Sequence, residues 1–300
     1  MWAQMDVYMY MKTYINTILT SGTDEQKSQL QSQLFMKDSG DLATTDGKNG
    51  ANTGLILRRD FIKNSREFEM EGPLFEDIFS LDRHLIQGVD LYIKLYRSSD
   101  QFFVISGEDA TAYKLQLLDC VYKICKIKVD PGIIVNHMKQ IETKPVHYNF
   151  QRTKVKRNTI NKDSREFIWD NMFNIRPSTL VLGLISQESG NARPLKLDFG
   201  DNREYATAYS NLFEVYEKLN RDAGLAITRE DYGKGYTLYA FPLNPKGLGN
   251  DYINLVKHGN VRADIKFKTG LPSAVTCIAF GVFDSFLERD HFRNVRYIQS

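Results

Sequence analysis

The sequence predicts a mainly β protein built from antiparallel sandwiches, and three observations lead to this fold class. Residues 260–268 alternate apolar and charged side chains without a slip, as a strand with one buried face requires. Residues 179–186 and 274–283 are nearly continuous apolar runs of the kind found in buried strands. Phe, Trp and Tyr make up 12% of the chain, and aromatic side chains favour strands and large buried interfaces.

The first 54 residues are expected to hold a strand-like start, two helices and a loop. Residues 5–11 read as the middle of a strand, whereas residues 10–22 have helical apolar spacing and end at Gly22. Thr23 followed by Gln26 fits a capping box that opens a second helix over residues 23–35. Residues 38–54 are polar and rich in glycine, which predicts an exposed surface loop.

From Leu55 to residue 143 the pattern predicts strands followed by one helix. Residues 88–97, 112–119 and 125–130 show strand-type apolar and polar patterning. The period then changes over residues 130–142, where an aspartate can cap a helix that starts with a proline. Three apolar residues of this helix share one face: Ile134, Met138 and Ile141.

A second block, residues 144–300, repeats this order of elements. Strands are expected over 146–157, 179–186, 235–243, 260–268 and 274–283. A helix over residues 205–220 carries Leu212, Tyr216 and Leu219 along one stripe. Two domains, residues 1–143 and 144–300, are therefore expected, each mostly strands with a helix in a long connection.

The composition limits the function classes. The chain has 300 residues, of which 42% are hydrophobic and 25% charged, so it is able to fold around a core. A formal net charge of +2 is too balanced to make nucleic acid the main partner. We expect no membrane span and no signal peptide. Three cysteines without framework spacing, Cys120, Cys125 and Cys277, favour a reducing compartment over secretion.

No residue pattern predicts a metal ion, a cofactor or a nucleophile. The five histidines are scattered without metal-ligand spacing: His84, His137, His147, His258 and His291. Cys277 lies in apolar sequence where a thiol behaves as a small hydrophobic residue, and nothing in the sequence lowers a cysteine pKa. The chain also lacks a glycine-rich phosphate loop. We therefore predict no catalytic, cofactor-binding or metal-binding residues.

Three charged clusters were weighed as candidate sites. Asp82, Arg83 and His84 are adjacent, but adjacent side chains of an extended segment point in different directions. Residues 229–231 are expected to form a turn before a strand. A carbohydrate-active enzyme on a sandwich would need two carboxylates facing one cleft, and no such pair is evident. The sequence thus predicts a protein that is not an enzyme.

The basic run over residues 152–157 is the third cluster. On a strand, Arg152, Lys154 and Lys156 project from one face, with Arg157 on the other. Such a row could meet phosphates, but the run lacks the interleaved aromatic residues of a single-strand binder. A solvated or subunit-contacting sheet face is the favoured reading.

Five stretches carry a family resemblance: residues 10–40, 68–106, 128–142, 227–245 and 254–295. The second contains Gly-Pro at 72–73, Asp-Arg at 82–83 and Gly-Val at 88–89, just before an alternating segment. The third is a strand-to-helix joint, and the last two hold the most distinctive motifs. Together these stretches resemble the capsid-like proteins of Polinton (Maverick) elements and adintoviruses over nearly the whole chain.

The resemblance implies a double jelly-roll major capsid protein of the adenovirus-type lineage. In such proteins two eight-stranded sandwiches lie side by side, and three chains form a pseudo-hexagonal capsomer. Residues 1–143 would be the first jelly roll, and residues 144–300 the second. Because family members carry further strands before the position of residues 5–11, we expect the first jelly roll to lack its opening strands.

The same resemblance implies the partners and the location. The chain would pack with itself as a homotrimer, with capsid neighbours, and with penton or minor capsid proteins. It would reside in the virion, and in the host cytoplasm or nucleus before assembly, with no cofactor and no specific nucleic acid. The alternative reading is a host-retained, non-catalytic jelly-roll module that binds another protein.

Overall fold

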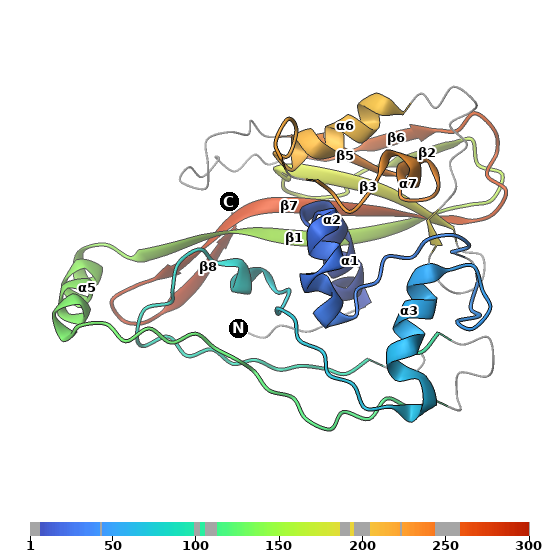
Figure 1. Ribbon diagram of the computed structural model, residues 1–300. Helices are drawn as coiled ribbons and strands as arrows, with labels where there is room; N and C mark the ends of the chain where they lie inside the picture. The colour runs from blue at the N-terminus through green and yellow to red at the C-terminus, as the bar shows by residue number, and fades with distance from the viewer. Residues whose placement is uncertain are drawn as a thin grey trace.

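The computed structural model describes residues 7–42, 44–98, 103–105, 113–186, 193–194, 205–222, 224–243 and 259–299. Within these residues the chain is mainly β, with antiparallel sheets and with helices in the connections (Figure 1). All described strands lie after residue 145. The predicted mainly β, antiparallel class is confirmed.

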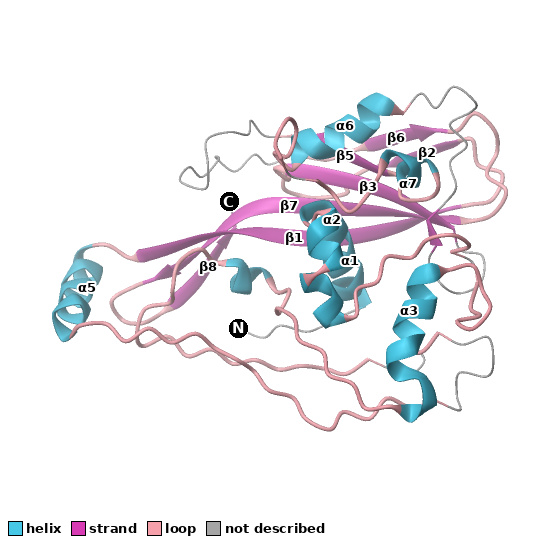
Figure 2. Ribbon diagram, viewed as in Figure 1, coloured by secondary structure: helices cyan, strands magenta, loops and turns pink. Residues whose placement is uncertain are grey.

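One sheet of six strands forms the centre of the molecule (Figure 2). β7 lies in the middle and pairs with β1 along its whole length, from Val146 opposite Arg289 to Ile160 opposite Val275. On its other side β7 pairs first with β3 and then with β8. The strands are β1 (Val146–Ile160), β3 (Thr179–Ser186), β4 (Arg193–Pro194), β5 (Leu238–Pro242), β7 (Val275–Arg289) and β8 (Val295–Gln299).

A two-stranded sheet covers one face of the central sheet. It pairs β2 (Glu166–Trp169) with β6 (Ala263–Lys266) in antiparallel register. The alternation over residues 260–268 is confirmed, because Ala263 is buried, Ile265 is half-buried, and Asp264 and Lys266 are exposed. The inward residues of β6 pack into a cluster with Trp169. The two sheets therefore make a sandwich.

Helices cover the opposite face and fill the connections. α1 and α2 pack near β1, and α6 and α7 lie over β5 and β3 (Figure 1). The helices are α1 (Val7–Thr20), α2 (Thr23–Lys27), α3 (Thr53–Ile62), α5 (Pro131–Thr143), α6 (Ala206–Val215) and α7 (Arg229–Gly233). Short 3₁₀ turns add η1 (Gln29–Gln33), η2 (Lys63–Ser65) and η3 (Asp77–Ser80).

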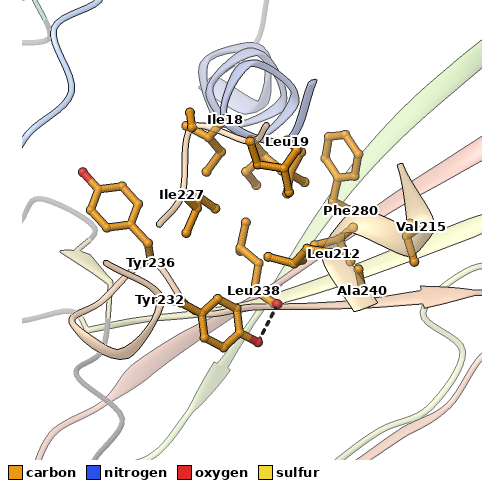
Figure 3. Close-up of a cluster of buried hydrophobic side chains, with 14 of the residues drawn as sticks. Ile18, Leu19, Leu212, Val215, Ile227, Tyr232, Tyr236, Leu238, Ala240 and Phe280 are labelled. Atoms are coloured by element: carbon orange, nitrogen blue, oxygen red, sulfur yellow. Dashed lines mark hydrogen bonds between the residues drawn. The ribbon is translucent and has the colours of Figure 1, made fainter. Parts of the chain in front are cut away.

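The core on the helical side joins the two ends of the chain. Leu19 of α1, Leu212 of α6 and Tyr232 of α7 are each fully buried and pack against β3, β5 and β7 (Figure 3). The Tyr232 hydroxyl donates a hydrogen bond of 3.0 Å to the Leu238 carbonyl. Full burial of a leucine contributes roughly 1.5–3 kcal/mol, so these contacts anchor α1 to the sheet.

The core on the sandwich side depends on a glycine of β7. The rings of Phe173 and Phe283 pack edge to face, with centroids 5.2 Å apart. A Cβ atom on Gly281 would lie 3.0 Å from atoms of both rings. Since cores are close-packed, any side chain here would displace the aromatic pair.

Several predicted elements are confirmed. α5 starts as expected, with the Asp130 carboxylate accepting from Gly132 N and Pro131 in the first turn. Strands cover the predicted ranges 146–157, 179–186 and 274–283. The helix predicted over residues 205–220 is shorter, because α6 ends at Val215; Leu219 lies beyond it and is 42% exposed.

Three predictions in the first 62 residues are wrong. Residues 7–11 belong to α1 rather than to a strand, because the helical spacing of Met11, Ile15 and Ile18 aims all three at the core. The predicted capping box does not form: the N-cap is Gly22, which has no side chain, and the Glu25 carboxylate accepts from Gly22 N at 3.3 Å, which is one half of such a box. The predicted loop ends early, at the N-cap Asn52 of α3, and this helix lies where the pattern predicts the first strands.

The strands predicted over residues 88–97, 112–119 and 125–130 are also not found. Residues 88–97, 113–119 and 125–130 form no ladder, and residue 112 lies outside the described residues. Both faces are exposed: Leu91 is 41% and Tyr92 77% accessible. A strand requires a neighbouring backbone for its hydrogen bonds, and no described segment supplies one.

Among the described residues, no helix has both the length and the apolar character needed to cross a bilayer.

Candidate interaction surface

The predicted row of cations on β1 is confirmed. Arg152, Lys154 and Lys156, here called the basic row, stand at alternate positions of β1 and so share one face of the sheet. Their register partners on β7 lie on the sandwich side of the sheet. Arg152 and Lys154 are half-buried, whereas Lys156 and Arg157 are exposed.

Each cation of the basic row lies over an aromatic ring. In the order Arg152, Lys154, Lys156, the rings belong to Tyr297, Phe283 and Phe173. The distances from Cζ or Nζ to the ring centroid are 5.0, 5.3 and 5.6 Å. Arg152 Nη1 also donates to the Tyr297 hydroxyl at 3.1 Å. The aromatic residues that the run lacks are supplied by β8, β7 and the connection after β2, which sequence spacing alone does not reveal.

The electrostatics of the basic row favour a partner that carries negative charge. Burial lowers the pKa of Lys154, and the like charges of Arg152 and Lys156 lower it further. An approaching carboxylate or phosphate would relieve this repulsion. A cation held over a ring also presents a flat, partly apolar surface, which suits a protein interface.

A second candidate surface is a belt of exposed apolar side chains between residues 85 and 135, here called the apolar belt. Leu117 is 67% exposed and Val121 70% exposed. Figure 1 shows these segments as long connections running from the end of β8 towards α3 and back to α5. The belt comprises Leu85, Leu91, Tyr92, Ile93, Leu95, Tyr96, Phe103, Ile105, Tyr113, Leu117, Leu118, Val121, Tyr122, Ile124, Ile127, Val129, Ile133 and Val135.

The histidines and cysteines do not converge within the described residues. No group of three or more His, Cys, Asp or Glu side chains there could hold a metal ion. His147 contacts Glu288 at 3.1 Å, while His84, His137 and His291 are exposed on separate elements. His258 lies outside the described residues.

The cysteines differ in exposure. Cys120 and Cys125 are exposed in the connection before α5, whereas Cys277 is fully buried in β7. Burial raises the pKa of the Cys277 thiol to about 12. A thiolate is the reactive form, so Cys277 is a packing residue.

The charged clusters have structural roles or none. Asp82, Arg83 and His84 lie in an exposed bend. Residues 229–231 open α7, where Asp231 forms a capping box with Thr228. The Asp231 carboxylate also accepts a hydrogen bond of 2.5 Å from Lys37 Nζ, which ties α7 to the N-terminal segment.

Comparisons with known proteins give two distant likenesses. No family model matches the chain. An uncharacterised protein of Caenorhabditis elegans is 22% identical over 255 residues, which is 73% of this chain and 60% of that protein. The crystal structure of the mavirus major capsid protein aligns with 52% of this chain and 42% of its own, at 11% identity and a TM-score of 0.26. A TM-score this low establishes no shared fold.

Proposed function

We propose that the chain is a structural subunit of a Polinton- or adintovirus-type capsid, which packs side to side with copies of itself into trimeric capsomers. The resemblance assigns residues 1–143 to an incomplete first jelly roll and residues 144–300 to the second, although the described part of residues 1–143 contains no strand. The observation that carries the proposal is the apolar belt. The motif resemblance and the antiparallel sandwich of β-strands agree with it.

The apolar belt implies a partner. Many large apolar side chains are exposed along these segments, and where such side chains gather into a large patch they mark a site of protein–protein interaction. The segments of the belt alternate apolar and polar residues as strands do, but they form no strand ladder in this structure. Their backbone N–H and C=O groups could therefore pair with the sheet edge of a neighbouring chain. A second copy of this chain is the partner that the family resemblance favours.

The proposed role is mechanical and requires neither catalysis nor a cofactor. Subunits would be held by the apolar belt and by the basic row, each buried against a neighbour. Penton or minor capsid proteins would be further partners, and the virion the final location.

The test is the absolute mass of the purified chain, measured by light scattering behind a sizing column. We expect a trimer. The variant Leu117→Lys places a positive charge in the apolar belt. Burying this charge in the contact between subunits costs free energy, so the trimer should dissociate. Leu57→Lys is the matched control, since Leu57 is 51% exposed on α3, outside the belt.

A wild-type monomer at all concentrations would contradict the capsomer and favour the host-retained interaction module. Equal dissociation by both lysine variants would show that the contact does not involve the belt. Trimers that persist in Leu117→Lys, with the control also trimeric, would place the subunit contact elsewhere.

A further inference from the structure

Arg289 is a buried charge that pairs with none of the described residues. It ends β7, between Val146 of β1 and Val295 of β8, and its side chain is only 2% exposed. Its Nε and Nη1 atoms are buried and make no hydrogen bond. Arginine is almost never fully buried unless it is paired, because desolvating a cation is costly.

A second guanidinium group approaches the same point. Arg293 lies in the turn between β7 and β8, where its N–H donates to the Asp290 carbonyl at 3.1 Å and its φ is +68°. A Cβ atom placed on Gly88 would lie 3.3 Å from Arg289 Nη2 and 3.6 Å from Arg293 Nε. Both arginines therefore converge on Gly88, which comes from a segment 200 positions away in the chain.

The neighbouring carboxylates are engaged elsewhere. Glu288 contacts His147, and the Asp290 carboxylate accepts from Asn294 N at 2.9 Å and from Asn294 Nδ2 at 3.0 Å. Within the part of the chain that the structure describes, no hydrogen bond or ion pair joins a carboxylate to either guanidinium. Both guanidinium groups thus lie beside Gly88 without a carboxylate partner among the described residues.

We propose that Arg289 and Arg293 form a binding site for an oxyanion, a phosphate or a carboxylate, beside Gly88. A guanidinium fork matches two oxygens of either group and binds them by charge-assisted hydrogen bonds. Gly88 and Arg293 are both exposed, so the anion approaches from their side. The absence of a side chain at Gly88 keeps both guanidinium groups within reach. This site does not depend on the proposed function.

The geometry also explains why Gly88 is a glycine. Its φ is +86°, in the left-handed region that other residues rarely adopt. The Ile86 N–H donates to the Tyr148 hydroxyl at 3.0 Å and holds this segment against β1. Tyr148 and Arg289 lie on the same face of the β1–β7 pair, so the segment fixes Gly88 over the guanidinium of Arg289.

The test is thermal unfolding of the full chain in sodium phosphate, sodium citrate and sodium chloride at matched ionic strength. An anion that binds only the folded state raises the melting temperature as its concentration increases. We expect phosphate or citrate to raise it above the chloride value, and the two salts distinguish a phosphate site from a carboxylate site. Loss of charge-assisted hydrogen bonds in Arg293→Met should weaken this binding roughly tenfold.

Arg289→Met should abolish the anion-dependent shift, and Arg296→Met, an exposed arginine of β8, is the matched control that should retain it. If Arg289→Met fails to fold, the exposed Arg293 still carries the test. The proposal is overturned if phosphate and citrate act no more strongly than chloride, or if the shift persists in both Arg289→Met and Arg293→Met. A free-energy gain in Arg289→Met without any anion effect in the wild type would identify Arg289 as an uncompensated buried charge.

Discussion

Replacing Asp231 by Asn should weaken the link between the N-terminal segment and α7. Lys37 Nζ donates to the Asp231 carboxylate and to the Ala226 carbonyl, both at 2.5 Å. The side chains of this ion pair are only 14% and 26% exposed. The same carboxylate accepts from Thr228 N at 3.1 Å and from Thr228 Oγ1 at 2.6 Å. One side chain therefore serves both an ion pair and a helix cap.

The expected loss follows from these contacts. A hydrogen bond to a charged group contributes about 1.5–3 kcal/mol, and a helix cap about 1 kcal/mol. Because Asn retains part of the cap and the pair is partly solvated, we expect Asp231→Asn to lower the free energy of unfolding by roughly 2 kcal/mol. Urea denaturation should show a lower midpoint at an unchanged m-value.

Glu230→Gln is the matched control for this prediction. Glu230 precedes Asp231 on α7 and pairs with Lys234, but these two side chains are 70% and 67% exposed. An exposed pair of this kind contributes no more than about 0.5 kcal/mol. Equal losses in the two variants would refute the reasoning, because burial and the Lys37 contact would then be irrelevant to the Asp231 effect.

The pH dependence gives an independent check. Burial by itself raises the pKa of Asp231, but hydrogen bonds from Lys37 and Thr228 outweigh it and hold the pKa below its usual value. A carboxylate whose pKa is lowered in the folded state stabilises the fold at pH values above its unfolded pKa of about 3.9. This stabilisation is lost as the pH falls towards the folded-state pKa. The difference in unfolding free energy between wild type and Asp231→Asn should thus be constant down to about pH 5 and shrink below about pH 4. A constant difference down to pH 2 would contradict this.

Two further predictions concern burial. Cys120 and Cys125 are exposed, whereas Cys277 is buried. A chromogenic disulfide reagent at pH 8 should therefore modify two thiols quickly and the third only after the protein unfolds. Rapid modification of all three thiols would contradict the burial of Cys277. Leu212→Ala should lower the free energy of unfolding by about 2–5 kcal/mol, because Leu212 is fully buried. Its control Leu219→Ala, at an exposed position, should change this free energy by no more than about 0.5 kcal/mol. Equal losses of the two variants in a urea titration would contradict the placement of α6.

Strands β1, β3, β5, β6 and β7 were predictable because their sequence patterns are strong, whereas the short strands β2, β4 and β8 were not predicted. β7 has nine buried positions in succession, from Val275 to Phe283, and β6 alternates without a slip. A continuous apolar run indicates a strand that is buried on both faces, and a strict alternation indicates a strand that is buried on one face. Local chemistry was equally informative at α5, where Asp130 and Pro131 mark the first turn.

The first half was harder because its patterns are ambiguous. Residues 53–62 contain a mixed set of apolar and charged residues, and their helical state depends on the Asn52 cap, which hydrogen-bonds Leu55 N at 3.2 Å. Residues 113–130 have strand-type composition, yet composition does not supply the neighbouring backbone that a ladder requires. Whether such a segment becomes a strand depends on a partner, within the chain or outside it.

Neither arginine of the proposed anion site was singled out from the sequence. Arg289 has a faint signal, since it stands at an inward position of a strand that is apolar over most of its length. Arg293 and Gly88 have none, because only the β7–β8 turn and the segment anchored on Tyr148 bring them together. Sites made by convergence of distant loops follow from topology rather than from spacing.

The basic row constrains how copies of this chain could associate. Across a two-fold axis the same patch meets itself, so a symmetric dimer centred on this face would place Arg152, Lys154 and Lys156 against their own copies. Like charges brought together in a desolvated contact are unfavourable, and burial, followed by the charges of Arg152 and Lys156, already lowers the pKa of Lys154. A ring in which each row contacts a different surface of the next copy avoids this, and a trimer is the smallest such ring.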